Sequence, residues 1–252
     1  MTSADAATRL FSDIMLSAYR LPLSFDAIPL QAEVAKVVTQ ARWVDHWADR
    51  LAAPGTWTVL PLVAGAGDID DSSTRLAADA APHPTAILAQ LPAMRATIEA
   101  FKTTLLRARL LRLKAGASIG EHRDYAYFTG RRWSFERGRI RVHIPIVTSD
   151  GVMWKLNGRD LTMAAGEAWY VNVCLRHSVE NRSAIDRINL VLELEVNDWL
   201  RNLFPPQNWR ERMWSATLRQ VEPRIWKVTD SWVQRRSGAP VGSTDKDSSA
   251  RR

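Results

Sequence analysis

Residues 139–147 read Arg-Ile-Arg-Val-His-Ile-Pro-Ile-Val, and this stretch decides the class of fold. Isoleucine or valine alternates along it with Arg139, Arg141 and His143. Because successive side chains of a strand point to opposite faces, the stretch predicts a half-buried strand with one apolar and one basic face. The basic face is expected to look into a space that requires positively charged groups.

Short stretches of similar character surround this strand and are separated by turn residues. We expect strands at residues 56–63, 105–113, 152–156, 161–163, 168–174 and 188–196. Asn157-Gly158, between two of them, is a strong hairpin signal. Many short strands with turns between them predict a sandwich or a barrel, and metal-ligand residues among them favour a double-stranded β-helix, the jelly-roll or cupin-like core.

Apolar residues at helical spacing flank this β-rich part of the chain. They predict helices at residues 9–20, at 31–51, at 85–101 with an interruption near Pro92, and from 198 to about 235. We therefore expect one globular domain, mainly β with flanking helices. Its expected parts are an N-terminal helical or mixed region at 1–100, a jelly-roll core at 101–197, C-terminal helices at 198–236 and a disordered tail at 237–252.

The composition indicates where in the cell the protein is expected and which partners its charge favours. The 252 residues contain no run of 18 or more apolar residues, so no membrane span is expected, and the N-terminus does not have the pattern of a secretory signal. A single cysteine excludes an internal disulfide framework and fits a reducing cytosol, so we expect a cytoplasmic protein. The net charge of +7 favours anionic partners such as small acids, acidic peptides or nucleic acid, or else provides a basic, soluble surface.

The chemistry of the chain is concentrated in His122, Asp124, His177 and Arg187. His122 and Asp124 are two residues apart, so both point to the same face if the backbone is extended there. His177 can complete the set from a neighbouring strand, giving the two-histidine, one-carboxylate ligand set of non-haem Fe(II) oxygenases. The planar guanidinium of Arg187, ten residues later, could bind the far carboxylate of a 2-oxo acid co-substrate.

Taken together, these motifs resemble one family. They are Leu111-x-Leu113-x-x-Gly116-x-x-Ile119-x-x-His122-x-Asp124, Arg141-x-His143-Ile144-Pro145, His177-Ser178-Val179-x-Asn181 and Asp186-Arg187-Ile188-x-Leu190. The combination resembles the aspartyl/asparaginyl β-hydroxylases, which are Fe(II)- and 2-oxoglutarate-dependent dioxygenases that use O2. Trp43-x-x-His46 and Gly55-x-Trp57 are similar to the N-terminal region of bacterial relatives such as proline cis-4-hydroxylases.

The resemblance implies roles for particular residues. It implies that Arg141 and His143 line the pocket and meet a carboxylate of the co-substrate or substrate; the plainer alternative is the polar outer face of an edge strand. The animal enzymes of the family lack the carboxylate ligand, whereas Asp124 is present here, so the chain is more similar to bacterial small-molecule hydroxylases. The same aspartate argues against halogenation.

Substrate contacts are the part of the site that the sequence defines least. The loop after Asp124 is long and basic, so we expect either a lid over an anionic substrate group or a solvated loop. The candidate contacts are Arg131, Arg132, Trp133, Arg137 and, from a neighbouring strand, Asn172.

The leading hypothesis is hydroxylation of a free amino acid or a small amino-acid derivative. The alternative is hydroxylation of a residue within a peptide or protein. A nucleic-acid dealkylase would continue Arg187-x-Asn189 to an arginine at position 193, which here is Glu193, so nucleic acid is not expected as a partner. A non-enzymatic, cupin-like binding protein would not require the complete ligand set. The sequence leaves the substrate, the position of hydroxylation and the oligomeric state open.

Overall fold

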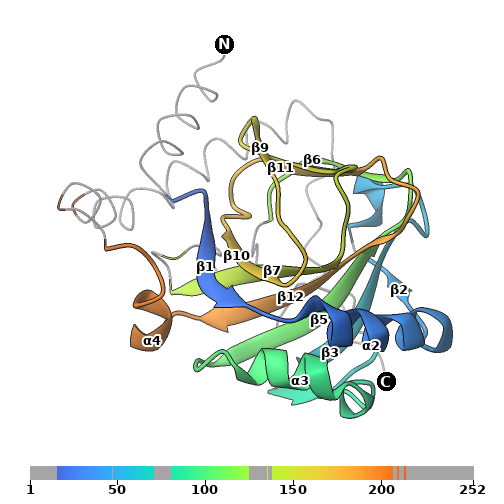
Figure 1. Ribbon diagram of the computed structural model, residues 1–252, viewed down its shortest axis with the longest axis horizontal. Coiled ribbons are helices and arrows are strands. Elements are labelled where there is room, and N and C mark those ends of the chain that lie inside the picture. Colours follow the sequence, from blue (N-terminus) through green and yellow to red (C-terminus); the bar gives the residue numbers. More distant parts are fainter. Residues whose placement is uncertain are drawn as a thin grey trace, which may run out of the picture.

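Two antiparallel β-sheets form the body of the molecule, one of eight strands and one of four (Figure 1). The structure, a computed structural model, describes residues 16–46, 48–70, 81–124, 135, 138–206, 209 and 213. The order of the large sheet is β1 (Ala18–Ser24), β10 (Glu167–Val171), β7 (Arg139–Val147), β12 (Arg187–Glu195), β5 (Leu105–Leu113), β3 (Trp57–Gly65) and β2 (Val44–Asp45), with β4 (Pro82–Pro84) paired to β3. The order of the small sheet is β6 (Ser118–His122), β11 (His177–Asn181), β8 (Val152–Leu156) and β9 (Arg159–Leu161).

The strands from β5 to β12 have the arrangement of a jelly roll. Four of them form the central run β10-β7-β12-β5 of the large sheet, and the other four form the small sheet in the order β6-β11-β8-β9. Apart from the hairpin of β8 and β9, neighbours in each run are not consecutive in the chain, as expected when successive strands fold back as two Greek keys. The expected mainly-β, double-stranded β-helix core is therefore confirmed. The remaining strands, β1 to β4, extend the large sheet at its two ends.

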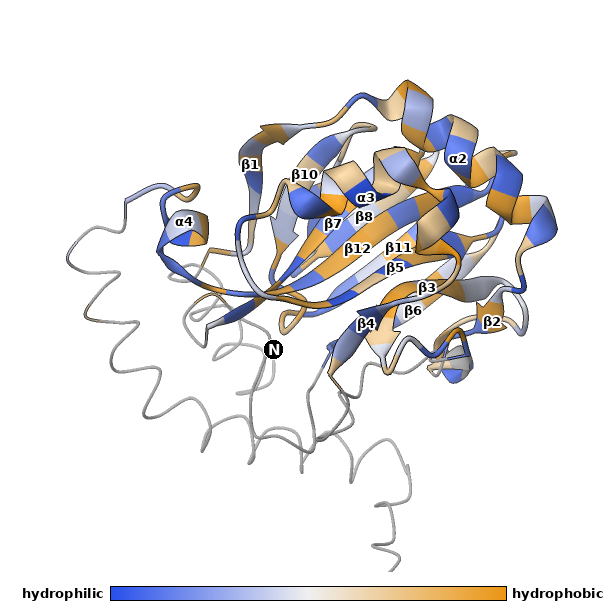
Figure 2. Cartoon of the chain, turned by 90° about the horizontal axis from the view of Figure 1, so that it is seen from below, coloured by the Kyte–Doolittle hydropathy of each residue, from blue (hydrophilic) through white to orange (hydrophobic). Residues whose placement is uncertain are grey.

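Helices cover the face of the large sheet that points away from the small sheet (Figure 2). The helices are α2 (Ala27–Gln40), α3 (Pro92–Glu99) and α4 (Asp198–Arg201), with the 3-10 turn η2 (Leu88–Gln90). A second 3-10 turn, η1 (Asp49–Leu51), lies against β6 of the small sheet. The Asp26 side chain caps α2 by accepting from the N–H of Ile28. The buried carboxylate of Glu33 in α2 accepts from the N–H groups of Ala93 and Met94 at the start of α3, and this fixes one helix against the other.

The described chain has two main apolar clusters, one on each side of the large sheet. The larger cluster joins the outer face of the sheet to α2 and α3, and it contains Leu60, Leu110, Ile144 and Leu190. The second cluster lies between the two sheets, around Trp57, Trp154 and Val179.

The inner face of the large sheet carries charge instead of a continuous apolar surface. Its buried polar side chains come from three adjacent strands: Arg107 and Arg109 of β5, Arg141 and His143 of β7, and Arg187, Asn189 and Glu193 of β12. Residues two apart on each strand share this face, as the alternation in residues 139–147 predicts. The basic face of that strand therefore looks into the interior of the jelly roll.

Most of the strand predictions are confirmed, three of them to the residue: 105–113, 139–147 and 152–156 are β5, β7 and β8. The helix predicted at 31–51 is wrong in its second half, because α2 ends at Gln40 and Val44 pairs with Val59 of β3. The helix predicted at 9–20 is wrong at its C-terminal end, where Ala18 begins β1; residues 1–15 lie outside the described residues.

The predicted C-terminal helical region begins with α4, and most of the chain after Pro206, including the expected tail, lies outside the described part of the molecule. Among the described helices, none combines the length and the apolar character needed to cross a membrane.

Candidate metal centre

His122, Asp124 and His177 meet at one end of the small sheet. His122 is the last residue of β6 and His177 the first residue of β11, and the antiparallel pairing of these strands places the two histidines opposite each other. Asp124 follows β6 and is held by its own N–H, which donates to the carbonyl oxygen of Val173 at 2.9 Å. The expected convergence of three side chains from two separate stretches is therefore present.

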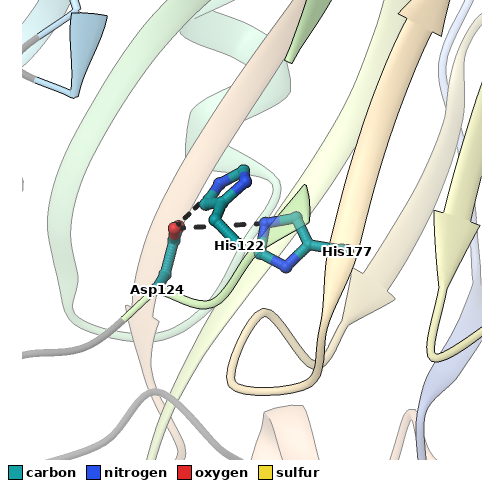
Figure 3. A group of neighbouring side chains, drawn as sticks. All are labelled: His122, Asp124 and His177. Carbon is teal, nitrogen blue, oxygen red and sulfur yellow. Dashed lines mark ion pairs between the residues drawn. The ribbon is translucent and has the colours of Figure 1, made fainter. Parts of the chain in front are cut away.

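Short distances join the three side chains (Figure 3). Oδ1 of Asp124 lies 3.3 Å from Nε2 of His122 and 4.0 Å from Nε2 of His177. The candidate ligand atoms all lie within 4.8 Å of one another. One ion could therefore contact one oxygen and two nitrogens at ordinary coordination distances.

Hydrogen bonds to the backbone orient both imidazoles for metal binding. Nδ1 of His122 lies 2.8 Å from the carbonyl oxygen of Gly120, and Nδ1 of His177 lies 2.9 Å from that of Leu175. A carbonyl oxygen can only accept, so each Nδ1 carries the proton and each neutral ring presents the lone pair of Nε2. Both Nε2 atoms are the ones nearest Asp124, so this donor set fits a divalent transition metal.

The charges around the centre keep the carboxylate ionised. Burial raises the pKa of Asp124, but the guanidinium of Arg141 and the neighbouring histidines outweigh it and hold the pKa well below its usual range. Burial lowers the pKa of His177 to about 4. Burial also lowers the pKa of His122, but the hydrogen bond and charge of Asp124 reverse this and leave the pKa raised. An ionised carboxylate and a neutral His177 are the forms that bind metal.

Arg141 lies behind Asp124 and has two acidic partners. Its Nη1 donates to Oδ2 of Asp124, and its Nη2 donates to Oε1 of Glu193 at 2.6 Å. The same oxygen of Glu193 accepts from Nη2 of Arg109 at 2.7 Å. All three supporting residues are buried, so the carboxylate at the centre is tied to the interior of the large sheet.

Arg187 lies on the same face of β12 as Glu193 and differs from Arg141 in its surroundings. The residue is 3% exposed, and its Nη2 has no hydrogen-bond partner among the described residues. Burial alone lowers its pKa to about 9. Asp186, the adjacent acid, instead accepts from the N–H of Ala115. A buried guanidinium in this state is suited to an anionic ligand, because burial of an uncompensated charge is unfavourable.

More buried polar groups surround Arg187. Both ring nitrogens of His143 and both side-chain polar atoms of Asn189 have no partner in the described part of the molecule. The Arg187 guanidinium lies 5.2 Å from the centroid of the Trp154 ring. The His143 ring meets the same Trp154 ring edge-on, with 5.1 Å between ring centroids. Trp154 also lies parallel to the ring of His177, with 5.9 Å between centroids. The candidate anion site is therefore adjacent to the candidate metal centre.

An aromatic pair bounds the other side of His122. The rings of His46 and Trp57 are stacked with centroids 3.6 Å apart, and Trp57 lies 5.9 Å from His122. Nδ1 of His46 accepts from the N–H of Ala48, which fixes the ring orientation. Burial, followed by the charge of Arg109, holds the pKa of His46 well below its usual value.

Five residues are expected from the sequence to contact the substrate, and Asn172 is the one that lies within the described part of the molecule. Arg131, Arg132, Trp133 and Arg137 lie outside the described residues. Asn172 is fully buried, where its Oδ1 accepts from the N–H of Cys174 and its N–H donates to the carbonyl oxygen of Ser17. Asn172 therefore supports the turn between β10 and β11.

Sequence reasoning overlooked Glu193 and Arg109 as parts of the site. Each is a charged residue in a nine-residue strand that is otherwise largely apolar. Arg109 is two residues from Arg107, and Glu193 is at an even spacing from Arg187, so the shared strand face was visible in the sequence. The pairing of β5, β12 and β7 that brings them together was not.

A comparison of the sequence with protein families gives a match over residues 26–196. The matching family is described as Aspartyl/Asparaginyl beta-hydroxylase. The match covers more than half of the chain and includes both halves of the candidate metal centre.

Solved structures with a similar arrangement include three bacterial proteins. An oxidoreductase of the 2OG-Fe(II) oxygenase family from Burkholderia pseudomallei is 16% identical, with 78% of this chain and 92% of that chain covered and a TM-score of 0.41. A prolyl-4-hydroxylase from Pseudomonas putida is 11% identical, with coverages of 77% and 99% and a TM-score of 0.44. HygX from Streptomyces hygroscopicus, solved with nickel, 2-oxoglutarate and hygromycin B, is 11% identical, with coverages of 79% and 88% and a TM-score of 0.44.

Proposed function

The chain belongs to the aspartyl/asparaginyl β-hydroxylase family and is a hydroxylase, and from this premise we propose its reaction. We propose that it uses Fe(II), 2-oxoglutarate and O2 to hydroxylate an unactivated C–H bond of a free amino acid or a small amino-acid derivative. The observation that carries the proposal is the convergence of His122, Asp124 and His177, with both Nε2 atoms turned to one carboxylate oxygen.

The three ligand residues have the donor set that Fe(II) takes in this class of enzyme. His122 and His177 would bind through Nε2, because each Nδ1 is committed to a backbone carbonyl. Asp124 would bind through Oδ1, because Oδ2 accepts from Arg141. When bound, the ferrous ion with 2-oxoglutarate supplies the oxidation: O2 converts 2-oxoglutarate to succinate and carbon dioxide, and its second oxygen atom enters the substrate C–H bond.

Arg187 is proposed to hold the distal carboxylate of 2-oxoglutarate. Its buried Nη2 lacks a partner within the described residues, and a carboxylate would supply both the hydrogen bond and the missing negative charge. His143 and Asn189 also have buried polar atoms without hydrogen-bond partners in the described part of the molecule, and these residues would complete this end of the co-substrate site. Arg141 would line the pocket from the side of Asp124, where it already holds two carboxylates.

The protein itself would exclude water and orient the substrate. The Trp154 ring lies close to both Arg187 and His177, and the Trp57 ring lies close to His122, so each imidazole has an indole ring beside it. Arg131, Arg132, Trp133 and Arg137 remain our proposed contacts to an anionic group of the substrate, such as an amino-acid carboxylate. A positioned C–H bond and a dry site account for much of the selectivity expected of such an enzyme.

The test is a coupled product assay. Purified protein is incubated without oxygen with Fe(II), 2-oxoglutarate and single amino acids, and air is then admitted. Succinate and a product heavier by one oxygen atom should form in equal amounts, as measured by mass spectrometry. The His177→Ala variant should form neither. Wild-type protein that binds Fe(II) but forms no succinate with any amino acid or short peptide would contradict the proposal.

The alternative substrate is a residue within a peptide or protein. The same assay separates the two, because free amino acids and peptides containing them can be compared at equal concentration. A turnover on peptides that exceeds turnover on every free amino acid would assign the enzyme to the second class.

A further inference from the structure

Glu193 joins two arginines at the back of the candidate metal centre. It lies on β12 directly opposite Arg141 of β7 in the register of the sheet. Its Oε1 accepts from Nη2 of Arg141 at 2.6 Å and from Nη2 of Arg109 at 2.7 Å. The glutamate is fully buried, and burial of an ionised carboxylate is tolerated only when opposite charges are in contact with it.

The contacts of Arg141 divide the two oxygens of Asp124. Nη1 of Arg141 binds Oδ2, while Oδ1 faces the Nε2 atoms of His122 and His177. A carboxylate held in this way has only one oxygen available for a metal. The guanidinium is planar, so the direction of Nη1 depends on where Nη2 is held, and Nη2 is held by Glu193.

Arg109 fixes the other side of Glu193. It lies on β5 and is 1% exposed, so the glutamate is held between two neighbouring strands. The result is a chain of side chains, Arg109–Glu193–Arg141–Asp124, that runs from the centre of the large sheet to the candidate metal ligand. Groups that support a metal ligand in this manner commonly change metal affinity by about 10- to 100-fold when they are altered.

We propose that Glu193 is a positioning residue for the metal centre: through Arg141 it keeps Asp124 a one-oxygen ligand, with Arg109 as its anchor. Without the carboxylate at 193, Arg141 loses the contact that orients it and turns away from Oδ2 of Asp124. Asp124 is then free to rotate, so its Oδ1 is no longer held facing the Nε2 atoms of His122 and His177, and the site loses a pre-oriented ligand. This inference rests on the proposed metal site and goes beyond it.

The experiment measures metal binding without turnover. Metal-free full-length protein is titrated with Mn(II) by calorimetry, and its Co(II) form is recorded by absorption spectroscopy, both without 2-oxoglutarate or substrate. In Glu193→Gln, which keeps the shape but not the charge, we expect Mn(II) affinity to fall by about 10-fold and the Co(II) bands to change in position and intensity. Glu193→Asp should recover part of the affinity.

Glu33→Gln is the matched control. Glu33 is also a buried carboxylate with two hydrogen-bond donors, but its donors are backbone N–H groups of α3 on the outer side of the large sheet. Its replacement should lower thermal stability while leaving Mn(II) affinity and the Co(II) spectrum as in the wild type.

The outcomes separate this inference from the proposed function. If wild-type protein binds neither Mn(II) nor Co(II), the proposed metal site fails. If wild-type protein binds both ions and folded Glu193→Gln has the same affinity and the same spectrum, Glu193 is a structural counter-charge only and the inference is overturned. Should Glu193→Gln not fold, Arg109→Gln carries the same test from the other end of the chain of side chains, with the same two outcomes.

Discussion

At the scale of single residues, Arg187 is the side chain whose buried charge costs folding stability but whose proposed role, binding a carboxylate, requires that charge. It carries a buried charge with no acidic partner among the described residues, and burial lowers its pKa to about 9. Such a charge destabilises the ligand-free protein, and a bound carboxylate compensates it. The residue is therefore expected to affect stability and co-substrate binding in opposite directions.

Arg187→Met tests this expectation. The variant should be at least as resistant to heat as the wild type without ligands, because the uncompensated charge is gone. It should bind 2-oxoglutarate about 100-fold more weakly, because a charged, two-pronged contact is lost. Calorimetry in the presence of Mn(II) and thermal unfolding provide the two readouts.

Arg112→Met is the matched control for this variant. Arg112 also lies over a tryptophan, with its guanidinium 4.6 Å from the Trp43 ring, but it points away from the interior and bonds Thr58. Its loss should leave 2-oxoglutarate binding unchanged. Equal affinity for 2-oxoglutarate in wild type and Arg187→Met would contradict the assignment.

How much of the site was predictable also depends on single residues. His122 and Asp124 are close in sequence, and metal chemistry restricts what such a spacing can do, so their convergence with His177 could be predicted. Glu193 acts through partners on β5 and β7, and its neighbours depend on strand register. A single sequence contains the alternation of each strand but not the register between strands, so the chain of side chains behind Asp124 could not be predicted.

At the scale of elements, Gly166 sets how closely β1 approaches the start of β10. Its φ is +81°, and a Cβ added there would overlap the carbonyl oxygen of Phe25. The N–H of Phe25 donates to the carbonyl oxygen of Gly166, and the N–H of Gly166 donates to that of Pro145, so the close approach joins three segments.

Gly166→Ala should therefore destabilise the protein by about 3 kcal/mol or more, because backbone must move as well as adopt a left-handed conformation. Gly158→Ala provides the comparison, since Gly158 has a φ of +78° but open space around its added Cβ. Gly158→Ala should lower the free energy of unfolding by about 1 kcal/mol. Denaturant unfolding measures both, and equal losses would show that backbone conformation alone matters at Gly166.

The three-strand cluster around Glu193 gives the protein a defined response to acid. Burial raises the pKa of Glu193, but Arg109 and Arg141 outweigh it and leave the pKa below the usual value of 4.5. Between the folded and unfolded pKa values, the unfolded chain binds more protons than the folded protein. The contribution of Glu193 is therefore complete above about pH 4.5 and is lost as the pH falls through the lower folded value.

Glu193→Gln should accordingly be less stable than the wild type at pH 7, by about 3 to 5 kcal/mol. The difference between the two proteins should narrow as the pH falls below 4.5. Urea unfolding at a series of pH values measures this difference. Glu180→Gln, which breaks the exposed pair with Arg182, should change stability little over the same series. If the difference in unfolding free energy between wild type and Glu193→Gln stayed constant down to strongly acidic pH, the lowered pKa of Glu193 in the folded protein would be contradicted.

The elements themselves were predictable where local pattern and tertiary contacts agree. Residues 139–147 alternate strictly and lie between two partner strands, and the predicted strand is correct to the residue. Residues 41–51 continue a helical pattern, but Val44 and Asp45 pair with β3 and His46 stacks on Trp57. Those contacts form only once the sheet exists, so the local pattern gave the wrong element there.

At the scale of the whole molecule, the proposed ligands bridge two sheets. His122 and His177 belong to the small sheet, whereas Arg187 and Arg141 belong to the large one. A metal ion with 2-oxoglutarate would connect these sheets across the interior. Binding to the folded state alone stabilises it by mass action, by about 2.7 kcal/mol at a ligand concentration 100 times the dissociation constant.

We therefore expect Mn(II) and 2-oxoglutarate together, without oxygen, to raise the unfolding temperature by roughly 5 to 10 °C. Calorimetric scans with each ligand alone provide the comparison, and the joint effect should exceed the sum of the two because each ligand completes the site of the other. His177→Ala should abolish the joint effect. A stabilisation by 2-oxoglutarate that is the same with and without Mn(II) would place its site away from the metal.

Two indole rings flank the candidate metal centre: Trp154 lies parallel to His177 and Trp57 lies beside His122, each with 5.9 Å between ring centroids. Light absorbed by these rings can pass to a transition ion held so near, and less of it is then emitted. The fluorescence of Trp57 and Trp154 should therefore decrease when the ion binds. Intrinsic tryptophan fluorescence should thus report how much of the metal site is occupied, without an added dye and without turnover.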